Sequence, residues 1–366
     1  MGAGESEKAV GAGYEGTGPV RDAHRFDAQR LADFMRRQVD ESIRSIEVEQ
    51  FKGGQSNPTF LIRANGKRYV MRRKPPGKLL PSAHAVDREY RVITALAKTD
   101  VPVAKSYALC QDDSVIGAMF YIMDYVAGRI LWDPRLPGMT PAERRAIFDE
   151  ANRVIAALHN VDYGSIGLVD YGKSGSYFVR QIDRWTKQYR AAETEKIEAM
   201  DNLIAWLPQH IPVDDETRIV HGDYRIDNVI FHPTEPRILA VLDWELSTLG
   251  HPLADFAYHC MTWRFPSGPQ SRGLWGADFA ALGIPSEADY VAAYCRRVGR
   301  DRLPEKEFEY YMAFNMFRLA GILQGITARA LQGNASSQNA LEAGSRTRPI
   351  AEQAWRQVEQ LMARGS

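Results

Sequence analysis

Hydrophobic and polar positions change their period along this chain, and the change divides it into two parts. From residue 23 to residue 124, short apolar runs mostly alternate with polar residues, which is typical of half-buried strands. From residue 125 to residue 366, apolar residues mostly recur every three or four positions, which is typical of helices. The pattern predicts an α+β fold with a small antiparallel-sheet lobe, residues 23–124, and a larger, mainly helical lobe, residues 125–366.

The first lobe is expected to combine a sheet with two helices. One helix begins after Asp27, a suitable N-cap, and a second occupies residues 82–98. The turn Asn65–Gly66 favours a hairpin. Residues 1–22, rich in Gly, Glu, Ser and Ala without an apolar period, are predicted to form a disordered tail. Strands are predicted over residues 43–51, 59–63, 67–73, 106–110 and 118–125.

The second lobe carries longer segments at helical spacing. Thr140, Pro141 and Glu143 together form a good helix start. Residues 229–232 and 239–242 are predicted to pair as a two-stranded hairpin. Helices are predicted over residues 140–158, 177–198, 199–207, 286–298, 306–332 and 348–362.

Composition and charge narrow the possible functions. Lys and Arg together number 46, as do Asp and Glu, so the net charge is zero and nucleic-acid binding is not expected. The chain has no apolar run of about 18 residues and no apolar run near its start, so neither a membrane span nor a signal peptide is expected. The cysteines, Cys110, Cys260 and Cys295, are far apart, which argues against disulfides or a zinc site and favours a reducing, cytoplasmic location.

The polar residues of segment 219–258 have the order that phosphoryl transfer needs. Asp223 follows an apolar strand, where its carboxylate can accept or orient the proton of an attacking hydroxyl. Asn228 and Asp243 offer an amide oxygen and a carboxylate that suit Mg²⁺, and the hairpin between them brings both to one end. These groups are the minimum for phosphoryl transfer from ATP. The alternative is that the HGD segment forms a simple turn and that Asp243 caps a helix. That alternative does not explain why these polar residues have a spacing that fits one site.

Other polar residues of this segment have electrostatic or structural interpretations. Arg225 could neutralise charge that develops on the transferred phosphoryl group, or it could pair with Asp227. Asp255 is predicted to be a buried acid that hydrogen-bonds the backbone near His221, and both residues are then structural.

The first lobe contains candidate ligands for the phosphates of ATP. The glycines and small polar residues of the segment FKGGQSNP could cover phosphates. The alternative for this segment is an ordinary β-turn. The residues concerned are Gly53, Gly54, Gln55, Ser56 and Asn57. On the strand after this hairpin, Arg72 and Lys74 share a face, and one cation there could reach the phosphates unless both are solvated edge charges.

Two further features would complete an ATP site. Glu89, in the middle of a predicted helix, could pair with the strand cation, although a surface ion pair with Arg88 or Arg91 is the alternative. The stretch from Met123 to Val126, which includes Tyr125, ends a buried strand at the place where adenine would contact a backbone hinge.

The motifs HGDYRIDN, VLDWE and HPLADFAYH resemble those of the aminoglycoside-phosphotransferase and choline-kinase superfamily, which has a protein-kinase-like fold of two lobes. The run MRRKPPGKLLPSAHAVDREYRVITAL is similar to the kinase-like domain found fused or adjacent to acyl-CoA dehydrogenases. The resemblance implies ATP and Mg²⁺ as cofactors, Asp223 as catalytic base, and Asn228 and Asp243 as magnesium ligands. It also places Glu89 opposite a phosphate-binding cation, here Arg72 with Lys74 as the second candidate.

The acceptor is expected to be a small molecule with a hydroxyl. Asp243 and Asp255 are only 12 residues apart and no APE motif follows, which leaves no room for the activation segment of protein kinases. Residues 310–332, the expected substrate wall, and residues 261–277 lack acids, which disfavours polycations such as aminoglycosides. A hydroxy acid or hydroxyacyl-CoA linked to fatty-acid oxidation is favoured. The basic and aromatic residues behind this argument are Trp263, Arg264, Phe265, Arg272, Trp275, Tyr310, Tyr311, Phe314, Phe317, Arg318 and Arg329.

Two rival functions stay open from the sequence. One is a catalytically silent module of the same fold that binds nucleotide or partners an acyl-CoA dehydrogenase. The other is a flavin-dependent dehydrogenase, which would need helices around a β-barrel, and the predicted order of elements does not supply them. The presence of Asp223, Asn228 and Asp243 together favours an active phosphotransferase.

Overall fold

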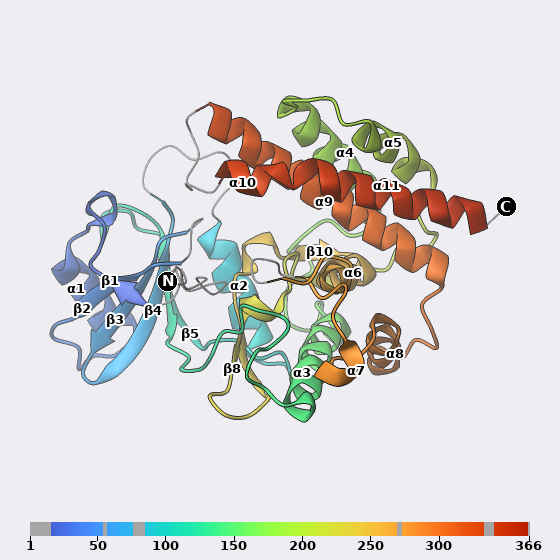
Figure 1. Ribbon diagram of the computed structural model, residues 1–366. Helices are drawn as coiled ribbons and strands as arrows, with labels where there is room; N and C mark the ends of the chain where they lie inside the picture. Colours follow the sequence, from blue (N-terminus) through green and yellow to red (C-terminus); the bar gives the residue numbers. More distant parts are fainter. Residues whose placement is uncertain (1–15, 54–56, 76–84, 269–272, 333–339, 365–366) are drawn as a thin grey trace, which may run out of the picture.

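The computed structural model describes residues 16–53, 57–75, 85–268, 273–332 and 340–364. These residues form a sheet lobe at one side and a mainly helical body at the other (Figure 1). The predicted α+β fold with two lobes is therefore confirmed. None of the helices in these ranges is both long and apolar enough to cross a bilayer.

Six strands within the described residues form one antiparallel sheet, in the order β1-β2-β3-β4-β6-β5. The predicted hairpin is confirmed, since β3 and β4 are joined by Asn65 and Gly66, both at positive φ. The strands are β1 Thr17–Gly18, β2 Glu47–Phe51, β3 Thr59–Ala64, β4 Lys67–Arg73, β5 Ser106–Cys110 and β6 Phe120–Asp124.

Alternation along the strands gives this sheet two buried faces. Tyr69 and Met71 of β4 pack in one apolar cluster with residues of α1 (Ala28–Gln38). Val70 of the same strand belongs to a second cluster, which includes α2 (Val86–Leu96) and continues through the helical lobe. The period of two thus makes β4 part of both cores.

The disordered tail predicted for residues 1–22 is too long. Thr17 and Gly18 pair with Phe51 and Gln50 at the edge of the sheet. The backbone N–H of Arg21 also donates to Oε1 of Gln50 at 3.0 Å. These contacts are made by backbone groups and by the side chain of Gln50. They do not need apolar residues at regular spacing, so the hydrophobic pattern gives no sign of them. Residues 1–15 lie outside the described residues.

The helical lobe surrounds two short antiparallel strand pairs. In one, β7 (Arg218–Val220) pairs with β10 (Thr248–Gly250); in the other, β8 (Val229–Phe231) pairs with β9 (Ile238–Val241). The helices are α3 Pro141–Asn160, α4 Tyr177–Ala191, α5 Glu198–Trp206, α6 Pro252–Cys260, α7 Phe279–Leu282, α8 Glu287–Arg297, α9 Glu305–Leu331, α10 Ala340–Ser345 and α11 Thr347–Arg364. Thr140 and Glu143 form a reciprocal capping box at the start of α3, as predicted.

The long helix α9 forms the centre of this lobe, with α11 lying along it (Figure 1). It packs against α4, α6, α10 and α11. The sequence predicts this helix over residues 306–332, and the observed helix begins and ends about one residue earlier. The helix predicted over residues 177–198 is shorter, because α4 ends at Ala191 and a turn precedes α5.

Candidate active site

A cavity of about 560 Å³ lies between the two lobes. The sheet contributes Gly53, Val70 and Arg72, and the segment from Met123 to Val126 closes one side. The helical lobe contributes Asn228, Ile230, Leu242 and Asp243 from the ends of the β8–β9 hairpin. Residues predicted for ATP binding and for metal binding therefore face the same space.

The backbone before Asp223 is held by one buried carboxylate. Asp255, at the start of α6, accepts hydrogen bonds from the N–H groups of His221 at 2.7 Å and Gly222 at 2.8 Å. Burial alone would raise the pKa of Asp255, but a hydrogen bond from His159 and these contacts hold that pKa below its usual value. The predicted structural role of Asp255 and His221 is confirmed.

The loop geometry requires glycine before the catalytic candidate. Gly222 has a φ of +83°, and a Cβ there would come 2.9 Å from the carbonyl oxygen of Leu246. His221 lies against the same region, and its Nε2 donates to the carbonyl oxygen of Leu242 at 2.7 Å. The loop that carries Asp223 is thus fixed to the residue directly before Asp243.

Both oxygens of Asp223 are engaged. Oδ1 accepts a hydrogen bond of 2.6 Å from the hydroxyl of Tyr258, and Oδ2 accepts one of 2.9 Å from Nδ2 of Asn228. The guanidinium of Arg225 lies 3.3 Å from Oδ1. The structure therefore brings Asp223, Asn228 and Arg225 together, as the sequence predicted.

Arg225 forms the predicted ion pair with Asp227 and also lies beside Asp223. Its Nε donates to Oδ1 of Asp227 at 3.0 Å while its Nη1 lies near Asp223. Burial opposes its charge, but the two neighbouring carboxylates raise the pKa of Arg225 above its usual value. The guanidinium is a fixed positive charge beside the catalytic candidate.

The predicted metal ligands are neighbours across the β8–β9 hairpin. The N–H of Leu242 donates to the carbonyl oxygen of Asn228 at 2.8 Å, which places Asp243 next to Asn228. Asp243 has a φ of 61°, a conformation that non-glycine residues seldom adopt and that the surrounding contacts must hold. Because Nδ2 of Asn228 is committed to Asp223, its amide oxygen is the atom left for a metal.

An amide oxygen and a carboxylate are ligands that fit Mg²⁺. The described part of the chain contains no group of three or more His, Cys, Asp or Glu side chains arranged to hold a metal. A magnesium ion at Asn228 and Asp243 would therefore take its other ligands from phosphate and water, which is its usual behaviour in phosphoryl-transfer sites.

Arg72 forms two ion pairs, one within the first lobe and one that joins the two lobes. Its Nε lies 3.1 Å from Oε2 of Glu89, and its Nη2 lies 3.1 Å from Oδ1 of Asp243. Glu89 is 1% exposed and also accepts hydrogen bonds from Asn57 at 2.8 Å and Tyr121 at 3.1 Å. Burial raises the pKa of Glu89, and the Arg72 cation works against that rise.

The alternatives for the phosphate cation differ in their surroundings. Arg72 lines the cavity, whereas Lys74 is not among the described residues that line it, and the N–H of Lys74 donates to Met119 outside it. In the glycine hairpin, Gly53 lines the cavity and Asn57 supports Glu89. Gly54, Gln55 and Ser56 lie outside the described residues.

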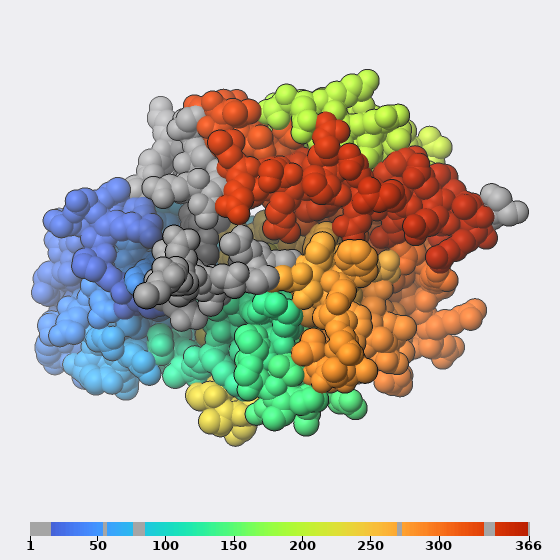
Figure 2. Space-filling view, in the orientation of Figure 1, coloured from blue at the N-terminus to red at the C-terminus, as the bar shows by residue number. Residues whose placement is uncertain are grey.

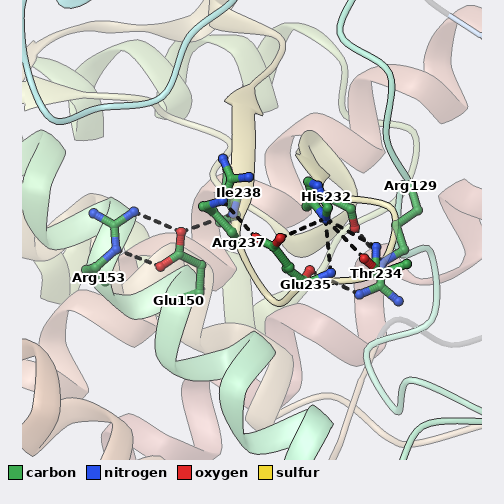
Figure 3. Close-up of polar contacts among 8 residues, drawn as sticks. All are labelled: Arg129, Glu150, Arg153, His232, Thr234, Glu235, Arg237 and Ile238. Atoms are coloured by element: carbon green, nitrogen blue, oxygen red, sulfur yellow. Dashed lines mark hydrogen bonds and ion pairs between the residues drawn. The ribbon is translucent and has the colours of Figure 1, made fainter.

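The β8–β9 hairpin, which carries the predicted metal ligands, is held by hydrogen bonds at the end that is away from these ligands (Figure 3). Arg129 donates to the carbonyl oxygens of His232 at 3.0 Å and Glu235 at 3.2 Å. On the other side, Oε1 of Glu150 in α3 accepts from the N–H of Ile238 at 3.0 Å. The hairpin is thereby fixed to the segment after the hinge and to α3, and the sequence offered no signal for these distant contacts.

Two site residues were missed by sequence reasoning or misjudged. Tyr258 donates to Asp223, and its place three residues after Asp255 in the same helix could have indicated this. The sequence places Arg318 of α9 in the expected substrate wall for an anionic acceptor but gives no sign of its contacts with the Asp223 loop. Arg318 is 7% exposed, donates to the carbonyl oxygen of Gly222 at 2.8 Å, and lies over the rings of Tyr258 and Trp185.

Most of the other residues in the acid-poor segments do not form a substrate wall. Arg264 pairs with Glu287 and Glu309 at 2.7 Å each, so its charge is already balanced. Arg272 lies outside the described residues, and Trp275 is 65% exposed. The aromatic residues that belong to the hydrophobic core are Trp263, Phe265, Tyr310, Tyr311, Phe314 and Phe317.

Comparisons with known proteins point to one family. The sequence profile of the phosphotransferase enzyme family matches residues 47–302. Acyl-CoA dehydrogenase family member 10 of Mus musculus is 47% identical over 345 residues, which are 94% of this chain but 32% of that protein. Family member 11 of Homo sapiens is 40% identical over 336 residues, 90% of this chain and 43% of that protein. The chain spans less than half the length of these curated relatives.

Solved structures agree with this match. A Ralstonia eutropha protein that carries the provisional name aminoglycoside phosphotransferase is 60% identical, with a TM-score of 0.85 over 92% of this chain and 99% of that one. A choline kinase from Cryptosporidium parvum has 12% identity and a TM-score of 0.65, covering 93% and 97%. An aminoglycoside phosphotransferase in complex with AMP-PNP and hygromycin B has 16% identity and a TM-score of 0.59, covering 90% and 99%. These distant likenesses show the fold that the sequence motifs implied.

Replacing Asp255 with Asn tests whether this carboxylate holds the loop that carries Asp223. The amide group presents an N–H to one of the two backbone N–H groups, which leaves buried donors without an acceptor. We expect the free energy of unfolding, measured with urea, to fall by about 3 kcal/mol. In the control Asp149→Asn, which removes an exposed partner of Arg297, we expect a change below about 0.5 kcal/mol. Equal losses in the two variants would contradict the assignment.

Proposed function

This chain belongs to the phosphotransferase enzyme family, and we propose that it transfers the γ-phosphoryl group of ATP to a hydroxyl of a small molecule. One observation carries the proposal. Arg72, Asn228 and Asp243 line a single cavity between the lobes, and Asp223 is hydrogen-bonded to Asn228. A phosphate cation, two oxygen ligands for a metal and a candidate base are then within one site.

The cavity offers suitable surroundings for each part of ATP. Its apolar walls include Val70, Ala104 and Leu242, and the hinge from Met123 to Val126 can offer backbone groups to adenine. Gly53 and Arg72 lie on the sheet side, where they would cover and pair with the phosphates. The relative that was crystallised with AMP-PNP shares this fold, which supports a nucleotide in the cleft.

The residues of the helical lobe would serve the transfer itself. Asn228 and Asp243 would hold Mg²⁺, which neutralises charge on the phosphate oxygens when it is bound. Asp223 would accept or orient the proton of the acceptor hydroxyl. Arg225, already paired with Asp223 and Asp227, would supply positive charge near the transferred group.

We extend the proposal to the acceptor, a hydroxy acid or hydroxyacyl-CoA. Arg318 supports an anionic acceptor, because no carboxylate lies within ion-pair distance of its guanidinium among the described residues, although Gly222 beside it accepts a hydrogen bond. Buried cations are normally paired with an anion. An aminoglycoside, as a polycation, would be repelled by Arg318.

The names of the curated relatives support a link to acyl-CoA chemistry. Those proteins are called acyl-CoA dehydrogenase family members and are more than twice as long as this chain. We propose that this chain acts on a compound that an acyl-CoA dehydrogenase also handles. Transfer of phosphate to its hydroxyl would turn the hydroxyl into a better leaving group.

Binding of ATP with Mg²⁺ is expected to raise the melting temperature of the wild-type chain by several degrees. Asp243→Asn keeps a side chain that tolerates positive φ but removes the charge that holds the metal, so we expect most of the shift to be lost. Asp149→Asn should behave as wild type. A wild-type chain without any shift would contradict the proposal and would favour a silent module that partners a dehydrogenase.

Arg72 and a metal are expected to compete for Asp243, since Arg72 pairs with that carboxylate directly. In Arg72→Gln, we expect Mn²⁺ alone to bind several-fold more tightly by calorimetry, whereas ATP should bind about tenfold more weakly, a loss of about 1.4 kcal/mol. The control Arg63→Gln removes an exposed cation that pairs with Glu49 and should change neither affinity. Weaker Mn²⁺ binding in Arg72→Gln would contradict this competition.

The acceptor is tested by ATP consumption with hydroxybutyrate isomers, their CoA thioesters, choline and kanamycin. We expect turnover with the acids or thioesters, and in Arg318→Gln a KM for that acceptor about tenfold higher with the KM for ATP unchanged. Arg329→Gln, an exposed cation on the same helix, is the control. Turnover with kanamycin alone would contradict the proposed acceptor class.

A further inference from the structure

The two oxygens of the Asp223 carboxylate have unequal surroundings. Oδ1 accepts a hydrogen bond of 2.6 Å from the hydroxyl of Tyr258 and forms an ion pair with Nη1 of Arg225 at 3.3 Å. Oδ2 accepts one side-chain hydrogen bond, from Asn228 at 2.9 Å. Oδ1 is therefore occupied by a hydrogen-bond donor and by a cation, whereas Oδ2 has one donor beside it. Because a carboxylate oxygen can accept about two hydrogen bonds, Oδ2 retains one acceptor position.

Tyr258 is held in place by the helix that also holds the catalytic loop. It lies one turn after Asp255 on α6, so a single helix contacts the backbone of Gly222 through Asp255 and the side chain of Asp223 through Tyr258. The guanidinium of Arg318 lies 5.2 Å from the Tyr258 ring and donates to the carbonyl oxygen of Gly222. The ring is buried, which leaves the hydroxyl little freedom to turn away.

The direction of the hydrogen bond between Tyr258 and Asp223 is fixed. Burial and the neighbouring Asp223 carboxylate raise the pKa of Tyr258 well above its usual value. The phenol therefore keeps its proton at neutral pH and donates to Oδ1. The predicted site residues do not include this tyrosine.

We propose that Tyr258 is a positioning residue for phosphoryl transfer: its hydrogen bond, together with the ion pair to Arg225, occupies Oδ1 of Asp223, so that Oδ2 receives the acceptor proton. The inference rests on the proposed function. In the transfer, the O–H bond of the acceptor breaks and its proton moves to Oδ2. The acceptor oxygen bonds to the γ-phosphorus, and the bond from that phosphorus to the β,γ-bridging oxygen breaks, with its electron pair leaving on ADP.

Tyr258→Phe removes the hydroxyl and keeps the ring beneath Arg318. The Asp223 carboxylate can then rotate, and fewer of its orientations present Oδ2 to the acceptor. We expect kcat to fall about tenfold, as is typical for loss of a hydrogen bond to a charged group, while the Kd for ATP with Mg²⁺ changes less than about twofold. The acceptor probe is the hydroxybutyrate isomer or thioester that the wild-type chain uses best.

Tyr310→Phe is the matched control. Tyr310 is also buried, on α9, but its hydroxyl donates to the carbonyl oxygen of Leu207 at 3.2 Å. We expect its kcat to stay within about twofold of wild type. Comparison of the melting temperatures of both variants with that of the wild type shows whether a lower kcat results from a less stable fold.

A second comparison separates positioning from a general structural effect. If Tyr258 acts through Asp223, adding Tyr258→Phe to Asp223→Asn should lower the remaining rate less than about twofold. A further tenfold loss in the double variant would overturn the inference, as would an unchanged kcat in Tyr258→Phe. A wild-type chain that transfers phosphate to no probe would contradict the proposed function itself, and the inference with it.

Discussion

The charged chain Glu89–Arg72–Asp243 is the interaction on which the arrangement of the two lobes depends. Glu89 and Arg72 are almost fully enclosed, and a buried charge without a partner would cost several kcal/mol. The two ions are satisfied only when α2, the sheet and the β8–β9 hairpin are packed together. The same three side chains line or adjoin the cleft, so the interaction that joins the lobes is also the one that ATP with Mg²⁺ would have to rearrange.

A second set of contacts holds the helical side of the site rigid. Asp255 fixes the backbone of the catalytic loop, Tyr258 fixes the side chain of Asp223, and His221 connects this loop to the hairpin. In Figure 2 the first strands of the sheet lobe, coloured blue, lie at the left, and the C-terminal helices, coloured red, lie at the upper right. Preorganisation of this kind places reacting groups without further reordering when substrates bind.

Much of the fold and several contacts were predictable from local patterns. The strand over residues 67–73, the cap of α3 and the backbone contacts of Asp255 follow from alternation, capping chemistry and motif order. Helix α6 was not predicted, because every one of its residues is buried and no amphipathic period results. For the same reason, the sequence does not show that the aromatic residues of α9 belong to the core, and it predicts them as part of a substrate wall. The contact of Arg318 with Gly222 joins residues far apart in sequence, so no local pattern predicts it.

The central claim is that Arg72, Asn228 and Asp243 together bind the phosphates and metal of ATP. A crystal structure of the chain with AMP-PNP and Mg²⁺ tests it most directly. The account predicts the Arg72 guanidinium on phosphate oxygens, the adenine against the hinge from Met123 to Val126, and the metal between Asn228 and Asp243. Nucleotide bound elsewhere, with the ion pair between Arg72 and Asp243 intact, would contradict it.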